Sequence, residues 1–269
     1  MTKQDHLSVE KKKLLRDFDF ETEQAFIAGG AITSVFTNKT IHDFDLYYKS
    51  REAFEIAVEA AYSKGLWCVA VSGRAITFTR GNTIYQLMCF RWFPTAADIF
   101  ESFDFTACMG AFDIDSDRFE LHERFLIDAA RRDLVFNHKT AYPLASGLRA
   151  LKYQGKGYSI DRREWLKLVT AISFQKIESW EELRDQIGGQ YGDQVAMDTT
   201  KPFNLENAIE ALAEAAIERS AESVAEAQTL EDVEKLDGIP ANAEEALAML
   251  FPREFAAQCR KEAKDGPRP

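Results

Sequence analysis

The stretch that decides the fold is FIAGG at residues 26–30, followed after a 12-residue gap by DFDL at residues 43–46. The short apolar run 25–28 is typical of a buried strand, and Gly29-Gly30 predicts a tight turn directly after it. Residues 31–36 have the length of one or two helical turns. From residue 41 to residue 48 the side chains alternate with a period of two, which predicts a second strand with Asp43 and Asp45 on the same face.

Paired carboxylates in this position are suited to phosphoryl-type chemistry. A divalent cation prefers oxygen ligands, and it offsets the repulsion between two neighbouring aspartates. A turn of two glycines lets main-chain N–H groups approach a phosphate without obstruction from side chains. An isolated D-x-D is more often a pair of surface aspartates at the end of a strand. Its position after a strand, a Gly-Gly turn and a short helix favours the metal site.

The rest of the chain predicts an α+β architecture. Residues 7–25 and 51–64 are helical in pattern, and strand-like runs follow at 66–71, 75–80 and 83–90, the last two joined at Gly81-Asn82. A further hairpin is expected from 105–114 and 118–122. After Arg124 the pattern predicts helices only. We therefore expect a mixed-sheet domain with flanking helices over residues 1–123, an all-helical domain over 124–260 and a flexible tail over 261–269.

Charge is distributed unevenly along this acidic chain, whose formal net charge is −11. Residues 204–250 hold 12 acidic and 2 basic side chains, whereas residues 124–167 hold 10 basic and 4 acidic ones. The basic segment favours a phosphate-bearing partner. In the acidic segment, glutamate recurs every four residues from Glu206 to Glu226. This pattern predicts a helix over 204–228 with a solvated face, or with a surface for a basic partner.

The sequence indicates a cytoplasmic protein. No apolar run approaches the roughly 18 residues that span a bilayer, and the N-terminus has no signal-peptide pattern. The four cysteines are far apart, without the spacing of a zinc site or a disulfide framework. We therefore expect no membrane partner, and the acidic balance leaves no expectation of DNA binding.

The motifs together resemble the nucleotidyltransferases with a polymerase-beta-like fold, in particular the head domain of bacterial-type tRNA CCA-adding enzymes and poly(A) polymerases. The resemblance runs in order over residues 26–163 and starts with the Gly-Gly and D-x-D motif. A hairpin over residues 75–91 and FDFTAC at 103–108 follow, with Asp104 and Thr106 on matching positions of the family's Arg-Asp-Phe-Thr-Ile-Asn motif. The last match is the helix after Pro143, with LRALKY at 148–153.

This resemblance implies metal-assisted attack of an acceptor on the α-phosphate of a nucleoside triphosphate, with pyrophosphate as the leaving group. Asp43 and Asp45 would hold Mg²⁺ or Mn²⁺. The residues that it places at the triphosphate or the nucleotide sugar are Gly29, Gly30, Asp104, Arg149 and Lys152. For Asp104, a capping or structural role is the alternative.

Three departures from the family pattern limit which of the family's activities can be expected of this chain. Gln86 stands where a third acidic metal ligand is expected, and it either lies at the metal site or is a strand residue facing solvent. Thr33-Ser34 replaces an Arg-Asp pair, and the Glu-Asp-x-x-Arg base-selecting motif has no counterpart. Nucleotidyl transfer is therefore expected as a class, whereas addition of a CCA end is not.

Several alternatives remain open at this point. The family and the basic segment favour the 3′ end of a tRNA-like RNA as acceptor, whereas the overall acidity and the missing motifs favour a protein hydroxyl or a small molecule. Gln86 also allows a non-catalytic nucleotide- or RNA-binding relative. A third hypothesis is an interaction protein whose acidic helix 204–228 masks the basic segment. The sequence does not predict the base preference or the oligomeric state.

Overall fold

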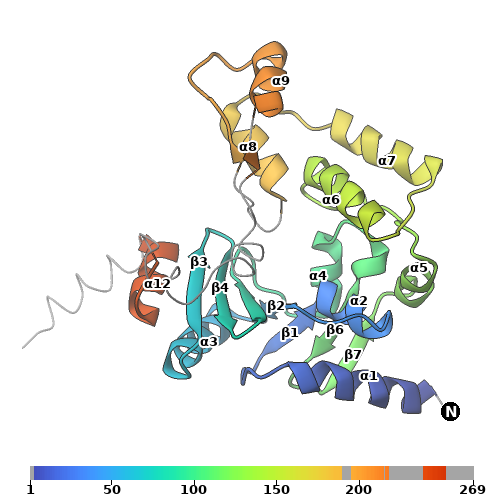
Figure 1. Ribbon diagram of the computed structural model, residues 1–269, viewed down its shortest axis with the longest axis vertical. Helices are drawn as coiled ribbons and strands as arrows, with labels where there is room; N and C mark the ends of the chain where they lie inside the picture. Colours follow the sequence, from blue (N-terminus) through green and yellow to red (C-terminus); the bar gives the residue numbers. More distant parts are fainter. Residues whose placement is uncertain (1–2, 190–194, 215, 218–238, 253–269) are drawn as a thin grey trace, which may run out of the picture.

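The computed structural model describes residues 3–189, 195–214, 216–217 and 239–252. Its centre is a seven-stranded sheet with the order β3-β4-β5-β2-β1-β6-β7 (Figure 1). The strands are β1 (Ala25–Ala28), β2 (Asp43–Tyr48), β3 (Trp67–Val71), β4 (Ala75–Arg80), β5 (Thr83–Met88), β6 (Gly110–Asp113) and β7 (Arg118–Leu121). The pair β2–β5 is parallel and the other neighbours are antiparallel. The predicted mixed sheet and α+β class are confirmed.

One face of the sheet, here called the packed face, carries the larger hydrophobic core. On β2 this face presents Phe44, Leu46 and Tyr48, all fully buried. Burying each such side chain contributes about 1.5–3 kcal/mol. The helices that supply residues to this core are α1 (Lys3–Asp17), α2 (Gly30–Phe36), α3 (Arg51–Ser63), α5 (Phe125–Arg131) and α12 (Ala243–Leu250).

The opposite face, here called the site face, is apolar at one end and polar at the other. Phe26, Tyr47 and Met88 pack there with Ile99 of α4 (Ala96–Ser102). Further along β2 the same face presents Asp45 and then Asp43, because side chains alternate along a strand. Strand alternation therefore directs both carboxylates away from the main core.

The helical half lies on the other side of the sheet from α1 and α3 (Figure 1). It contains α6 (Pro143–Gly155), α7 (Arg162–Ser173), α8 (Trp180–Gly188) and α9 (Leu205–Glu214). Phe125 and Ala246 come from the predicted helical domain, yet both are buried in the core of the packed face. The division of the chain at residue 123 stays a prediction.

The structure corrects the prediction that no strand follows Arg124. Strand β8 (Val195–Ala196) pairs with β9 (Ala216–Ile217), which falls inside the predicted acidic helix 204–228. Glutamates four residues apart oppose a helix by about 0.2–0.5 kcal/mol per pair. The β-branched Ile217 also favours a strand. Residues 205–214 of the predicted helix form α9, whereas residues 215 and 218–228 and the tail 261–269 lie outside the described residues.

Two element boundaries also differ from the sequence pattern. The first helix ends at Asp17 instead of continuing to residue 25. The strand expected from Phe105 begins at Gly110, because a 3-10 turn occupies Thr106–Cys108. Among the described residues, no helix combines the length and apolar character needed to cross a membrane.

Candidate functional site

Asp43 and Asp45 lie on the site face of β2, between β1 and β5. Asp45 is 3% exposed and Asp43 is partly exposed. In the sheet register Asp45 lies opposite Ala28 on one side and Gln86 on the other. The small side chain of Ala28 is therefore the neighbour of Asp45 on one side.

The Gly29-Gly30 turn lies directly against both carboxylates, as the sequence predicts. A methyl group added at Gly29 would lie 3.5 Å from Asp45 Oδ2, and one at Gly30 would lie 3.5 Å from Asp43 Oδ2. Gly29 has φ 78°, a conformation that residues with a β-carbon rarely adopt. The two glycines thus add no side chain of their own next to the aspartates, where the ring of Phe103 also lies 3.5 Å from the methyl position at Gly29.

Thr33 fixes this turn, a role that sequence reasoning missed. Its hydroxyl lies 3.1 Å from the carbonyl oxygens of Gly29 and Ala107, and the N–H of Gly29 donates to the carbonyl of Gly110 at 3.1 Å. The available signal was a threonine four residues after a glycine in a short helix, which can bond back to the preceding turn. Thr33 stands where the nucleotidyltransferases that the sequence resembles have an arginine. In this chain the buried Thr33 side chain instead holds the glycine turn in place.

Gln86 lies next to Asp45 and does not face solvent. It is 4% exposed, and its Oε1 is buried without a hydrogen-bond partner among the described residues. Leaving a buried polar group unsatisfied costs about 1–3 kcal/mol. A cation held by Asp45 would remove that cost, since an amide oxygen is an acceptable ligand for magnesium or manganese. The solvent-facing alternative for Gln86 is wrong, and its role as a metal ligand stays a prediction.

The candidate ligands for a divalent cation on this face carry oxygen donors only. No group of three His, Cys, Asp or Glu side chains suited to a metal occurs within the described ranges. The predicted set of two carboxylates and one amide oxygen, from Asp43, Asp45 and Gln86, stays a prediction. These hard oxygen donors fit Mg²⁺ or Mn²⁺ better than they fit zinc.

Gln86→Glu is expected to tighten the binding of Mg²⁺ or Mn²⁺ in the presence of a non-hydrolysable nucleoside triphosphate. A carboxylate is a charged and harder ligand than an amide, so the expected gain is about tenfold in affinity. Calorimetric titration of both proteins measures it. Equal affinities would remove Gln86 from the metal site and leave a centre of two aspartates.

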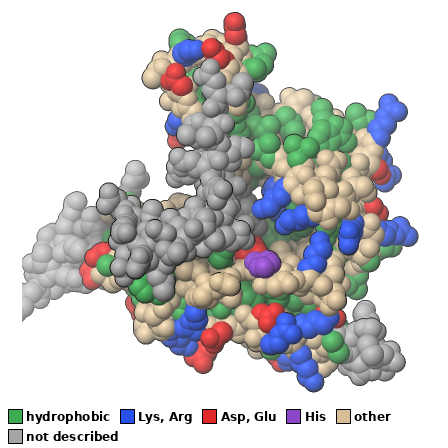
Figure 2. Space-filling model, in the orientation of Figure 1, with side chains coloured by type: hydrophobic (Ala, Val, Ile, Leu, Met, Phe, Trp, Pro, Cys, Tyr) green, Lys and Arg blue, Asp and Glu red, His purple; other side chains and the backbone are tan. Residues whose placement is uncertain are grey.

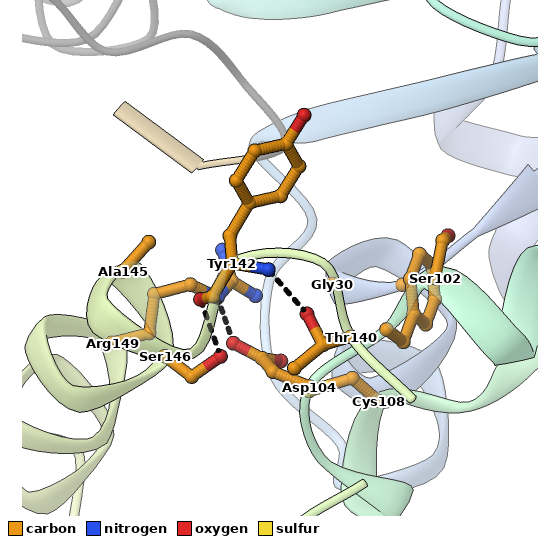
Figure 3. Close-up of a pocket in the computed structure, with 11 residues that line it drawn as sticks. Gly30, Ser102, Asp104, Cys108, Thr140, Tyr142, Ala145, Ser146 and Arg149 are labelled. Atoms are coloured by element: carbon orange, nitrogen blue, oxygen red, sulfur yellow. Dashed lines mark hydrogen bonds and ion pairs between the residues drawn. The ribbon is translucent and has the colours of Figure 1, made fainter. Parts of the chain in front are cut away.

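A shallow pocket adjoins the glycine turn on the side of the helical half, and its empty volume of about 390 Å³ includes open solvent. Its walls come from the turn, from residues 102–108 and from the start of α6 (Figure 3). Four of the five residues predicted to contact the nucleotide line it, namely Gly29, Gly30, Asp104 and Arg149. Lys152 is exposed on α6 and does not line this pocket. Its contact with a triphosphate stays a prediction.

Asp104 and Arg149 form an ion pair in the pocket wall. Arg149 Nε donates to Asp104 Oδ2 at 2.6 Å, and the Asp104 side chain is 8% exposed (Figure 3). The carbonyl of Asp104 accepts from the N–H of Asn137, whose side-chain amide donates to the carbonyl of Phe103 at 2.7 Å. Asp104 therefore has the structural role that the sequence left open, and it orients Arg149. Its contact with a nucleotide sugar stays a prediction.

Thr106, the other residue matching the family motif, binds a buried carboxylate. Its hydroxyl donates to Asp128, which also accepts from Arg124 Nε at 3.0 Å and Nη2 at 2.9 Å. Asp128 is 1% exposed, so these bonds hold the segment after Asp104 against α5. Sequence reasoning missed Asp128; the available signal was an arginine and an aspartate at i,i+4 spacing.

Cys108 supplies a thiol to the pocket wall. Burial raises the pKa of Cys108 to about 11, and the nearby Asp104 carboxylate acts in the same direction. Its Sγ lies 2.8 Å from the hydroxyl of Tyr153. Cys108 therefore remains a neutral thiol at physiological pH and is no candidate nucleophile.

Gly30→Ala is expected to leave the fold stable while it impairs binding of a metal–triphosphate complex. Gly30 begins α2 and has no positive φ, so alanine is tolerated and raises helix stability by up to about 1 kcal/mol. The added methyl would contact the Asp43 carboxylate and occupy the space beside it. Thermal unfolding and nucleotide titration measure the two effects. Unchanged affinity would show that the ligand does not approach this turn.

In sequence, residues 3–132 match the family model described as "Gabija anti-defense 2 family protein". A curated protein named "Gabija anti-defense 2", from Bacillus phage SPbetaL7, is 39% identical over 195 residues, which are 71% of this chain and 49% of that protein. The chain thus spans about half the length of this curated relative.

Similar solved structures come from tRNA-processing enzymes. A CCA-adding enzyme in complex with CTP has a TM-score of 0.49 and 14% identity, over 77% of this chain and 54% of that one. A "tRNA-processing enzyme (apo form I)" has a TM-score of 0.48 and 13% identity, over 100% and 83%. A tRNA nucleotidyltransferase complexed with a primer tRNA and an ATP analogue has a TM-score of 0.44 and 14% identity, over 91% and 84%. All three TM-scores are below 0.5.

Proposed function

We propose that this chain is a divalent-metal-dependent nucleotidyltransferase, which transfers a nucleoside monophosphate from a nucleoside triphosphate to an acceptor and releases pyrophosphate. The observation that carries the proposal is that both aspartates lie against the Gly29-Gly30 turn, and that the two glycines of this turn line an open pocket.

The proposed roles follow from where each residue lies. Asp43 and Asp45, with the amide oxygen of Gln86, would hold Mg²⁺ or Mn²⁺. An ion held by these residues would supply Lewis-acid stabilisation of the charge that develops during transfer. Main-chain groups of the glycine turn would bind the triphosphate in the pocket. Arg149, oriented by Asp104, would offset its negative charge, with Lys152 further along α6.

We propose the 3′ end of an RNA as the acceptor, and the cytoplasm as the place of reaction. The basic segment 124–167 supplies cations that can neutralise an RNA backbone. The curated relative is named for activity against a defence system, and we propose that transfer by this chain also serves counter-defence. A protein hydroxyl is the alternative acceptor, favoured by the acidity of the whole chain.

A non-catalytic nucleotide-binding protein is the second candidate function, and Gln86 is the observation that favours it. With an amide in place of a third carboxylate, the site has one fewer negative charge to hold a second metal ion. Such a protein would bind a metal–triphosphate complex without turnover.

The test is incubation of the chain with each nucleoside triphosphate, labelled at the α-phosphate, together with Mg²⁺ and either total RNA or cell lysate. Label that becomes acid-insoluble and sensitive to ribonuclease supports transfer to RNA. Label sensitive to protease identifies a protein acceptor instead. Binding of the triphosphate without any transfer, with every acceptor, would reject the enzyme in favour of the binding protein.

A further inference from the structure

Helix α7 exposes a stripe of large apolar side chains on the outside of the helical half. Trp165, Leu166 and Val169 are between 41% and 54% exposed, and their spacing places them on one side of the helix. The opposite side of α7 packs within its own protomer. Leu168 is buried there, and the Glu164 carboxylate accepts a hydrogen bond from the N–H of Phe136 at 3.0 Å. Figure 2 shows hydrophobic side chains gathered over α7.

Helix α9 exposes a second apolar stripe. Leu205, Ile209 and Leu212 are between 40% and 78% exposed and follow one another at i, i+4 and i+7. The neighbouring side of α9 packs on α8 through the small residues Ala208 and Ala211. The stripe therefore stays exposed when α9 packs on α8 within its own protomer.

The charges around the two stripes have opposite signs. The exposed basic side chains on α7 itself are Arg162, Arg163 and Lys167. The exposed acidic side chains on α9 and on the adjacent α8 are Glu181, Glu182, Asp185, Glu206 and Glu210. In Figure 2 acidic side chains gather at the top, over α9. One protomer thus presents two surfaces, each with an apolar stripe at its centre. The charged side chains near the α7 stripe are basic and those near the α9 stripe are acidic, so the two surfaces are complementary in charge.

We propose that two copies of this chain form a symmetric dimer in which α7 of each protomer packs against α9 of the other. With a two-fold axis between the copies, α7 of the first contacts α9 of the second, and α9 of the first contacts α7 of the second. The two contacts are equivalent. Each contact buries an apolar stripe against another and places basic rims beside acidic rims. This dimer is independent of the proposed nucleotidyl transfer, because neither stripe includes a residue assigned to the metal or the triphosphate.

Sedimentation velocity of the full chain, over a range of concentrations and at low salt, is the direct test. The expected result is a reversible monomer–dimer equilibrium that weakens as salt screens the charged rims. Leu166→Glu on α7 and Ile209→Lys on α9 are each expected to weaken dimerisation by about tenfold or more. Ile56→Glu is the matched control, since Ile56 is 60% exposed on α3, away from both stripes, and its variant keeps the dimer.

Mixing the two variants distinguishes this arrangement from other dimers. A mixed dimer of Leu166→Glu with Ile209→Lys has one unaltered α7–α9 contact and one contact in which the new Glu and Lys face each other. We therefore expect the mixture to dimerise more tightly than either variant alone. A wild-type chain that stays monomeric at every concentration would overturn the proposal. A dimer that neither variant weakens, or variants that mixing does not rescue, would do so as well.

Discussion

Asp43→Asn and Asp45→Asn are each expected to reduce nucleotidyl transfer by about 10²–10³-fold or more, since each removes charge that stabilises the transition state. Asparagine keeps the shape of the side chain but replaces a charged oxygen ligand with a neutral amide. Asp45 is the more sensitive position, because it is 3% exposed and lies in register with Gln86. Turnover with α-labelled triphosphate measures the loss, and a wild-type rate in either variant would reject the metal role.

The fold is expected to survive both substitutions. The two aspartates are neighbours on one strand face, so removing one negative charge relieves repulsion in the metal-free protein. The midpoint of thermal unfolding should therefore stay constant or rise. Asp133→Asn is a suitable control, because asparagine preserves the oxygen that accepts from Ser159 Oγ, and this position lies outside the pocket. Its transfer rate should equal that of the wild type.

Gly110→Ala is expected to destabilise the protein by about 1–3 kcal/mol through overpacking. The added methyl would lie 2.7 Å from Ile32 Cγ2 and 3.0 Å from the ring of Phe125, both fully buried. Relief of this clash would move α2 or α5 away from the sheet. Because the carbonyl of Gly110 accepts from the N–H of Gly29, the glycine turn would move too. Transfer should therefore fall together with stability.

Chemical denaturation of Gly110→Ala and of a matched variant, Gly147→Ala, measures this effect. Gly147 lies inside α6, and a methyl there would meet its nearest atom, Ile172 Cδ1, at 3.8 Å. Gly147→Ala should thus raise the free energy of unfolding by about 0.5–1 kcal/mol, as expected for a glycine replaced within a helix. If Gly110→Ala were as stable as the wild type, the tight contact between β6, α2 and α5 would be wrong.

Local sequence pattern was sufficient for the part of the site that lies on one short stretch of chain. The period-two alternation of residues 41–48 predicted the common face of Asp43 and Asp45, and the Gly-Gly pair predicted the turn beside them. Both depend on backbone geometry within a few residues. The packing that buries Phe44 and Leu46 on the opposite face follows from the same alternation.

Contacts between distant segments could not be derived in the same way. The position of Gln86 beside Asp45 depends on the parallel pairing of β2 with β5, which an intervening helix and two strands separate along the chain. The ion pair between Asp104 and Arg149 requires α6 to dock against the sheet domain. The pairing of β8 with β9 was missed because two-residue strands have no periodicity to detect.

Pyrophosphate release tests the central claim most directly. The wild-type chain and Asp45→Asn are each supplied in turn with ATP, CTP, GTP and UTP, with Mg²⁺, and with total RNA or lysate as the source of acceptor. We predict that the wild type releases pyrophosphate from at least one triphosphate, that chelation of Mg²⁺ stops the release, and that Asp45→Asn releases almost none. No release by the wild type with any triphosphate and acceptor, or equal release by both proteins, would contradict the assignment of a nucleotidyl-transfer centre to Asp43 and Asp45.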